Sequence, residues 1–276
     1  MGITLPMTHP STGVTIVASQ VAIFGNAASP ATPIDIRDGV PVLEGATGNA
    51  GGIVANAGSG GVNFAANADS GDVWSIGNVT LNSGAVINGN LRTHGTVTPN
   101  PPLTQVTGTS SLGTTINLGL TVIRATFPPR PLQDFNQSTD LTLASGSYGD
   151  VTLNGGTLTL SPGTYTFESL TLNSGTTFAP NTTNPVFINV RNALIFRGHI
   201  GTYNANNVRF AAFSSLGATL EQDAGSPLLG TVVAINGPLI LQGSRSCQGA
   251  LFGQTSSVQP GATLRHIAFS AWESPQ

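Results

Sequence analysis

The chain of 276 residues is long enough to bury a continuous core, in one elongated domain or two compact ones. Only 8% of its residues are charged, yet 39% are hydrophobic and the mean hydropathy is +0.15. This excludes a disordered chain, which combines low hydrophobicity with high net charge. The nine basic residues, all arginine, and twelve acidic ones give a net charge of −3, too little positive potential for a nucleic-acid partner.

Two further classes are excluded by residue usage. Cys247 is the single cysteine, so no disulfide framework or cysteine-based zinc cluster can form, and its apolar flanks predict a small buried residue. No stretch approaches about 18 consecutive apolar residues, and residues 1–15 lack a basic n-region. The sequence therefore predicts no membrane span and shows no signal peptide.

In chain order, residues 1–71 come first, with runs of Gly, Ala and Asn between short apolar pieces. Such runs are typical of flexible linkers, but the interleaved Val, Ile and Phe suit small, tightly coiled turns equally well. We expect an irregular leading β segment here and leave both alternatives open.

From residue 72 a strand-and-corner phrase recurs, with close copies at 79–84, 151–156 and 170–175 and variants at 141–146 and 158–163. Its first and third residues are Leu or Val and its second is Thr, so an extended strand sends them to opposite faces. Gly, Asn and Ser, which tolerate a sharp bend, follow each strand. Hairpins of a β-sandwich would also show frequent turns. Only stacked coils, however, give equivalent strands a reason to repeat the same letters.

The sequence therefore predicts an all-β protein, a β-solenoid that we expect to be right-handed, over residues 72–276. Its core would be Leu, Val, Ile and Phe and its corners Gly, Asn and Ser. Pro-rich stretches at 99–102 and 128–131 predict an excursion over about 99–138. Short helices are predicted only near 131–137 and 211–216. The decisive expectation is that Leu153 and Leu172 lie in register in successive turns.

The phrases at 77–90 and 160–175 resemble the polymer-forming β-solenoid domains of bacterial envelope proteins, the bactofilins and surface-displayed modules. This resemblance implies a non-enzymatic structural protein, located outside the cell or on its surface, that self-assembles into a filament. The Pro-Gly-Thr-Tyr turn at 162–165 is similar to turns in the microbial ice-binding β-helix proteins, which usually carry a long helix beside the coil.

Few residues are candidates for catalysis, ligand binding or metal binding. Asp140 and Asp150 precede consecutive strand phrases and form a weak candidate pair for a polysaccharide-cleaving enzyme, although each Asp is typical of a corner cap. Arg191, Arg197 and Arg209 lie in or beside three successive apolar strands. If they line one face, their planar guanidinium groups would suit the carboxylates of acidic sugars. The histidines are scattered, so we assign no catalytic residue, metal or cofactor.

The outward threonines are the candidate binding residues. Stacking would align them in a weakly polar array that presents a glycan-binding surface or orders water for ice recognition, although Thr is also a common strand residue. The array comprises Thr80, Thr142, Thr152, Thr159 and Thr171.

The first function predicted from the sequence is self-assembly, because terminal coils expose unpaired strand edges that another copy of the chain can extend. Binding of glycan or ice is the alternative, and a β-helix enzyme the second alternative. The expected partner is therefore the protein itself, with glycan as a further candidate.

Overall fold

The computed structural model describes residues 2–6, 20–28, 31–44, 49–99, 105–114, 120–222 and 226–271. In these residues the chain is an all-β solenoid of about ten turns, built mainly of parallel strands and with very little helix, such as the 3-10 turn η2 (Ala205–Asn207). The prediction of an all-β solenoid is confirmed. Both predicted helices are wrong, because strand β16 (Phe135–Gln137) and strand β25 (Val208–Ala212) lie there and pair with neighbouring turns.

The register between turns is the one that the repeats predict. Strand β18 (Gly146–Leu153) runs parallel to β20 (Gly163–Leu172), with Thr152 opposite Thr171 and Leu153 opposite Leu172. Equivalent side chains are therefore stacked on one face rather than opposed across two layers, which excludes a sandwich.

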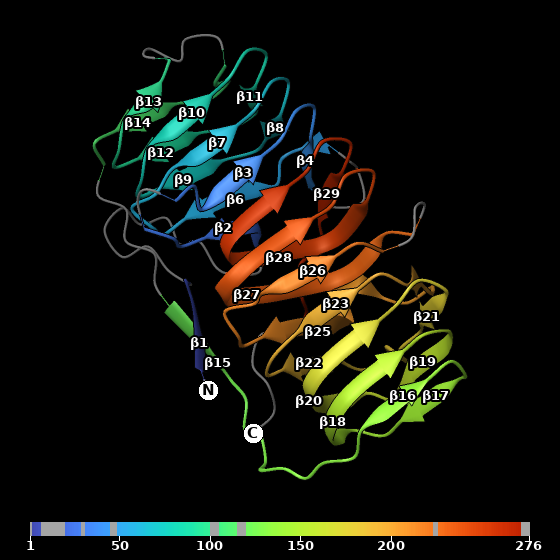
Figure 1. Cartoon of the computed structure of the whole chain (residues 1–276). Coiled ribbons are helices and arrows are strands. Elements are labelled where there is room, and N and C mark those ends of the chain that lie inside the picture. The colour runs from blue at the N-terminus through green and yellow to red at the C-terminus, as the bar shows by residue number, and fades with distance from the viewer. Residues whose placement is uncertain are drawn as a thin grey trace.

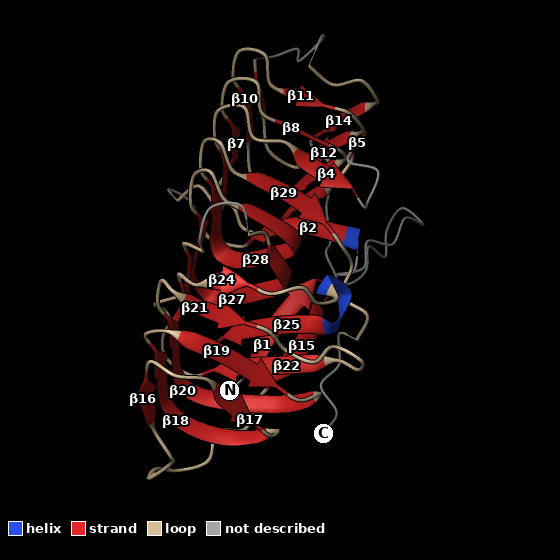
Figure 2. Ribbon diagram, turned by 90° about the vertical axis from the view of Figure 1, so that its right-hand side faces the viewer, coloured by secondary structure: helices blue, strands red, loops and turns tan. Residues whose placement is uncertain are grey.

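Each turn has three sides, which we call faces A, B and C, and the turns stack along the long axis (Figures 1 and 2). The strands of face A are parts of β18, β20, β27 (Leu228–Leu241) and β28 (Ser246–Val258), together with β25, β22 (Val186–Val190), β2 (Val21–Gly25), β6 (Ile53–Asn56), β9 (Val73–Ser75), β12 (Leu91–Thr93) and β14 (Ser110–Leu112).

The strands of face B are β16, the second halves of β18, β20, β27 and β28, and β23 (Leu194–Phe196), β26 (Ala218–Leu220), β3 (Ile34–Ile36), β7 (Val62–Phe64), β10 (Val79–Leu81) and β13 (Val97–Thr98). Those of face C are the first parts of β27 and β28, and β17 (Leu141–Leu143), β19 (Gly156–Leu160), β21 (Thr176–Phe178), β24 (His199–Ile200), β29 (Thr263–His266), β4 (Val42–Glu44), β8 (Asp69–Ser70) and β11 (Val86–Ile87). The short β5 (Asn49–Ala50) pairs antiparallel with β4.

The inward side chains of all three faces meet in one long core of Leu, Val, Ile and Phe. Phe178, Phe196 and Phe210 pack together in consecutive turns with ring centroids 5.6 to 6.2 Å apart. The ring of Tyr165 is also buried, and its hydroxyl donates to the carbonyls of Leu143 and Ser161 at 3.0 and 2.8 Å. Aromatic stacking therefore fills the core without leaving this polar group unpaired.

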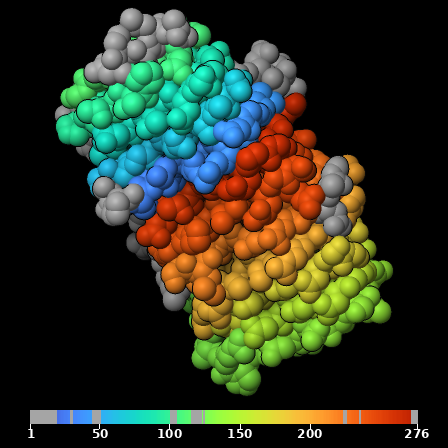
Figure 3. Space-filling model, turned by 45° about the horizontal axis from the view of Figure 1, so that its top comes forward, coloured from blue at the N-terminus to red at the C-terminus, as the bar shows by residue number. Residues whose placement is uncertain are grey.

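The chain does not follow the stack from end to end. Residues from Val21 onwards begin in the middle and climb to one end at β14, while residues from Phe135 onwards begin at the opposite end and return to the middle at β29 (Figure 3). The two halves meet where β28 pairs with β2 and β3, and β29 with β4. At this seam the Ser256 hydroxyl donates to the Phe24 carbonyl at 2.7 Å, so the solenoid continues across a break in the chain order.

Candidate functional site

Face B carries the longest regular row of outward side chains that is left open to solvent. Ten successive parallel pairings place one outward residue per turn in a single line, at the usual spacing of about 4.8 Å between parallel strands. From one end to the other, this row, which we call the face B row, is Asn136, Thr152, Thr171, Ile195, Thr219, Ile240, Ser257, Asp35, Asn63, Thr80 and Thr98.

The face B row is weakly polar. Its members are half-buried by their neighbours in the row, except for the two terminal ones, which are exposed. Asp35 is the row's charged member, and its carboxylate pairs with the Nε of Arg37. The row members from Asn136 to Ser257 are all uncharged. They present only hydroxyl, aliphatic and amide groups along the centre of the face.

The margin of face B is ordered by amide ladders. Asn173 donates to Asn154 at 2.8 Å and Asn154 donates to Asn136 at 2.9 Å, so three successive turns are linked side chain to side chain. At the other end, Asn82 donates to Asn63 at 3.0 Å and Asn63 to Asp35 at 2.8 Å. These hydrogen bonds hold the polar groups of the face in fixed positions before any ligand arrives.

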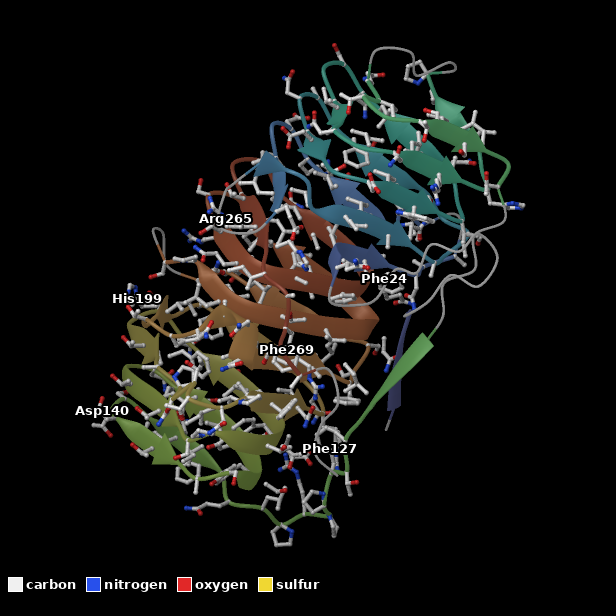
Figure 4. The ribbon with its side chains drawn as sticks, turned by 180° about the vertical axis from the view of Figure 1, so that it is seen from behind. Phe24, Phe127, Asp140, His199, Arg265 and Phe269 are labelled. Carbon is white, nitrogen blue, oxygen red and sulfur yellow. The ribbon has the colours of Figure 1, made fainter. Side chains whose placement is uncertain are left out.

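Face A also has an outward row, but its central part is covered. The antiparallel pair of β1 (Gly2–Pro6) and β15 (Leu120–Arg124) runs beside it, followed by residues 125–130. A second hydrophobic cluster forms beneath this segment, in which Ile123 and Ala125 pack with Phe24, Val233 and Phe252. Figure 4 shows Phe24, Phe269 and Phe127 along this side of the molecule. The covered part of face A therefore cannot contact a large ligand.

Ion pairs attach residues 125–130, which continue the cover of face A, to the corner between faces A and B. Glu168, only 3% exposed, pairs with Arg191 at 2.8 Å and with Arg130 at 3.8 Å. Arg130 also binds Asp150 at 2.8 Å, and this hydrogen bond lowers the pKa of the Asp150 carboxyl. Arg191 stacks over the Phe127 ring at 5.0 Å. These charged groups are thus used to hold the cover in place.

The threonines predicted from the sequence divide between two faces. Thr80, Thr152 and Thr171 belong to the face B row, and Thr152 and Thr171 are direct neighbours. Thr142 and Thr159 lie opposite each other on face C, in β17 and β19. The five residues therefore form no single array, and we keep the face B members as candidates.

The other residues of interest are also separated. Asp140 lies at the corner that precedes the face C strand β17, where its Oδ1 accepts a hydrogen bond from the Thr157 N–H at 2.8 Å. Asp150 directly precedes the face B part of β18 and pairs with Arg130. The two carboxylates thus serve a corner cap and an ion pair, not a shared pocket. Among the described residues, no three His, Cys, Asp or Glu side chains gather in a possible metal site.

The three arginines do not line one face. Arg197 lies at the margin of face B, whereas Arg209 is fully buried on the outer side of face A, between Phe187 and Phe269 at 4.9 and 6.0 Å. Burial lowers the pKa of Arg209 to about 10. Cys247 is buried as predicted, and burial raises the pKa of its thiol to about 12, which makes it an inert core residue.

Eight members of the face B row were not among the residues predicted from the sequence: Asn136, Ile195, Thr219, Ile240, Ser257, Asp35, Asn63 and Thr98. Ile195, Thr219 and Ile240 each lie between two inward apolar residues, as Thr152 does between Val151 and Leu153. The alternation is visible at these three strands, but they lack the Asn-Ser-Gly or Asn-Gly-Gly corner that identifies the repeated phrase.

Comparisons with known proteins add little to this geometry. No protein-family model matches the chain, and no curated protein matches it. One similar solved structure is an ice-binding protein from an Antarctic bacterium of the Flavobacteriaceae, at 14% identity over 90% of this chain and 80% of that one, with a TM-score of 0.30. Another is a glycosylated ice-binding protein from an Arctic yeast, at 14% identity over 94% of this chain and 96% of that one, with a TM-score of 0.27.

No helix within the described ranges has the length and apolar character needed to cross a membrane.

Proposed function

We propose that the protein is a non-enzymatic surface-binding protein that adsorbs to ice through face B. The observation that carries this proposal is the uninterrupted face B row, which has eleven residues in register. Ice is an extended lattice of hydrogen-bonded water, so a matching protein surface must itself be extended and periodic.

The chemistry of the row suits ordered water. A Thr hydroxyl donates and accepts hydrogen bonds, while its methyl group and the Ile side chains do not compete for water. Ten steps of about 4.8 Å give a strip about 48 Å long. Because parallel pairing fixes the backbone and the amide ladders fix the margin, adsorption costs little conformational entropy, and many weak contacts can add together.

Glycan binding is less well supported by the same face. Ligand sites for organic molecules are concave and bury most of the ligand surface. The face B row follows a regular surface rather than a cleft.

Self-assembly into filaments stays a prediction from the sequence. It would use the outer edges of the terminal turns, and near one end the segment before β16 contains Pro128, Pro129 and Pro131, which have no N–H to donate to a neighbouring strand. This weakens that edge as a template and favours surface binding. Rods in negative-stain micrographs of the purified protein would support assembly instead.

Because ice forms outside cells before it forms inside them, we propose that the protein acts in the extracellular space or at the cell surface. The solenoid needs no cofactor for this role, since the row itself is the binding surface.

Thr171→Tyr tests the proposal, because a ring projecting from the third residue of the face B row would hold the neighbouring turns away from the ice. We expect ice adsorption about tenfold weaker, or about 1.4 kcal/mol, seen as a loss of thermal hysteresis. The matched control is Thr159→Tyr, the same change in a half-exposed strand residue of face C. Equal thermal hysteresis in the two variants would refute face B as the binding surface.

A further inference from the structure

A shallow depression of about 460 Å³ lies at the corner between faces B and C. Its lining comes from the corners after four successive face B strands, β20, β23, β26 and β27. The residues are Ser174, Arg197, Glu221, Gln242, Gly243 and Arg245. Arg197, Glu221 and Gln242 each follow, by two positions, a central member of the face B row. The depression thus borders the row without being part of it.

The charges in the depression are unbalanced. The Nε of Arg197 donates to Glu221 at 2.8 Å, so this arginine and this carboxylate neutralise each other. Arg245 forms no ion pair within the described part of the chain, and its Nε–H is buried without an acceptor there. A buried donor without a partner costs free energy, so the guanidinium of Arg245 lines the hollow with hydrogen-bonding capacity and charge that no group of the described chain compensates.

The other lining groups are polar and small. The Gln242 amide can both donate and accept hydrogen bonds, the Ser174 hydroxyl does the same, and Gly243 leaves its backbone accessible. The lining contains no aromatic or aliphatic side chain, and its volume falls within the range of small-molecule sites, about 300 to 1,000 Å³. A ligand that fits must therefore be small, rich in hydroxyl groups and negatively charged.

We propose that this depression binds a sugar acid, with the carboxylate on the guanidinium of Arg245 and the sugar hydroxyls on Gln242 and Ser174. The planar fork of a guanidinium matches a carboxylate in two parallel hydrogen bonds. This site is independent of ice adsorption, since it uses the corner and not the face B row, and either proposal can fail without the other.

Binding to the depression can be measured by NMR from the arginine side chains themselves. All nine basic residues are arginine, so the Nε–H signals in a ¹H–¹⁵N spectrum report only these nine groups, and single substitutions assign them. D-glucuronate is titrated into the full chain. Its methyl ester, which has the same ring without the charge, and inorganic phosphate, which has charge without the sugar, are titrated separately.

We expect glucuronate to move the Nε–H signals of Arg245 and Arg197, and Arg245→Gln to weaken its binding at least about tenfold, since charge-assisted hydrogen bonds are about twice as strong as neutral ones. Arg245→Lys, which keeps the charge but not the fork, should retain part of the affinity. The matched control is Arg37→Gln, another half-exposed arginine at the margin of face B, which should bind like wild type. Circular dichroism shows whether each variant is folded.

Three results would overturn the proposal. The first is equal binding of glucuronate and its methyl ester, and the second is wild-type affinity in folded Arg245→Gln. The third is phosphate binding as tight as that of glucuronate, which would make the depression a general anion site. Thermal hysteresis of Arg245→Gln, measured in parallel, should equal that of wild type.

Discussion

Phe210→Ala is expected to lower the free energy of unfolding by about 4 kcal/mol, the usual range for a fully buried Phe being about 3 to 5 kcal/mol. Phe210 is 1% exposed and contacts Phe178 and Phe196 in the two preceding turns. Because each turn is fixed by hydrogen bonds to the turns above and below it, the strands cannot move inward to fill the cavity. Urea unfolding followed by circular dichroism measures the change.

The control for this substitution is Leu216→Ala, since Leu216 lies at a corner and is 68% exposed. Its loss should change the free energy of unfolding by less than about 0.5 kcal/mol. A similar effect of both substitutions would mean that the stacked aromatic rings contribute no more than a surface side chain, contrary to the described core.

Gly77→Ala is expected to cost about 3 kcal/mol, at the upper end for overpacking. A Cβ atom on Gly77 would lie 1.6 Å from the carbonyl oxygen of Gly60 in the adjacent turn. Both backbones are held in place. The Gly77 carbonyl accepts hydrogen bonds from the Ser75 and Thr93 hydroxyls at 2.8 and 2.7 Å, and the Gly60 carbonyl accepts one from the Asn56 amide at 2.9 Å. The close approach of stacked corners thus requires glycine at this position.

Gly61→Ala provides the comparison, because the added Cβ would meet nothing closer than the Asn78 oxygen at 3.3 Å. We expect a markedly smaller change in thermal unfolding temperature for this variant. If Gly77→Ala unfolded at the same temperature as Gly61→Ala, the turns would not be stacked as closely as described.

The fold was predictable because the repeats report a local rule. In the phrases around Thr152 and Thr171, the alternation of apolar and hydroxyl residues sets which side chains point inward, and the Gly and Asn that follow set the corner. Both features act within a few residues, and therefore a single sequence reveals them. The helix prediction near Ala211 failed because Ala211, which points outward but is buried, and Phe213 interrupt the alternation of apolar and hydroxyl residues.

The candidate site was only partly predictable, because a phrase identifies a strand but not the face on which it lies. Two strands with the same letters occupy one turn, so Thr152 and Thr171 lie on face B while Thr142 and Thr159, from intervening phrases, lie on face C. Assigning faces requires the length of each complete turn, which varies with the corners.

The seam and the cover were not predictable from local pattern at all. Phe24 pairs with Phe252 across most of the chain, and the cluster beneath Ile123 joins segments from both halves. Neither contact has a repeated motif, because each is made once, by packing that depends on the finished solenoid. The sequence therefore does not predict that part of face A is covered, or that face B is the surface left open to solvent.

The most direct test of the central proposal is the distribution of the wild-type protein between ice and liquid during slow freezing. If face B adsorbs to ice, the protein should be incorporated into the growing crystal, and Thr159→Tyr with it, while Thr171→Tyr should stay in the liquid. Exclusion of the wild-type protein from the ice, to the same extent as Thr171→Tyr, would contradict the proposal.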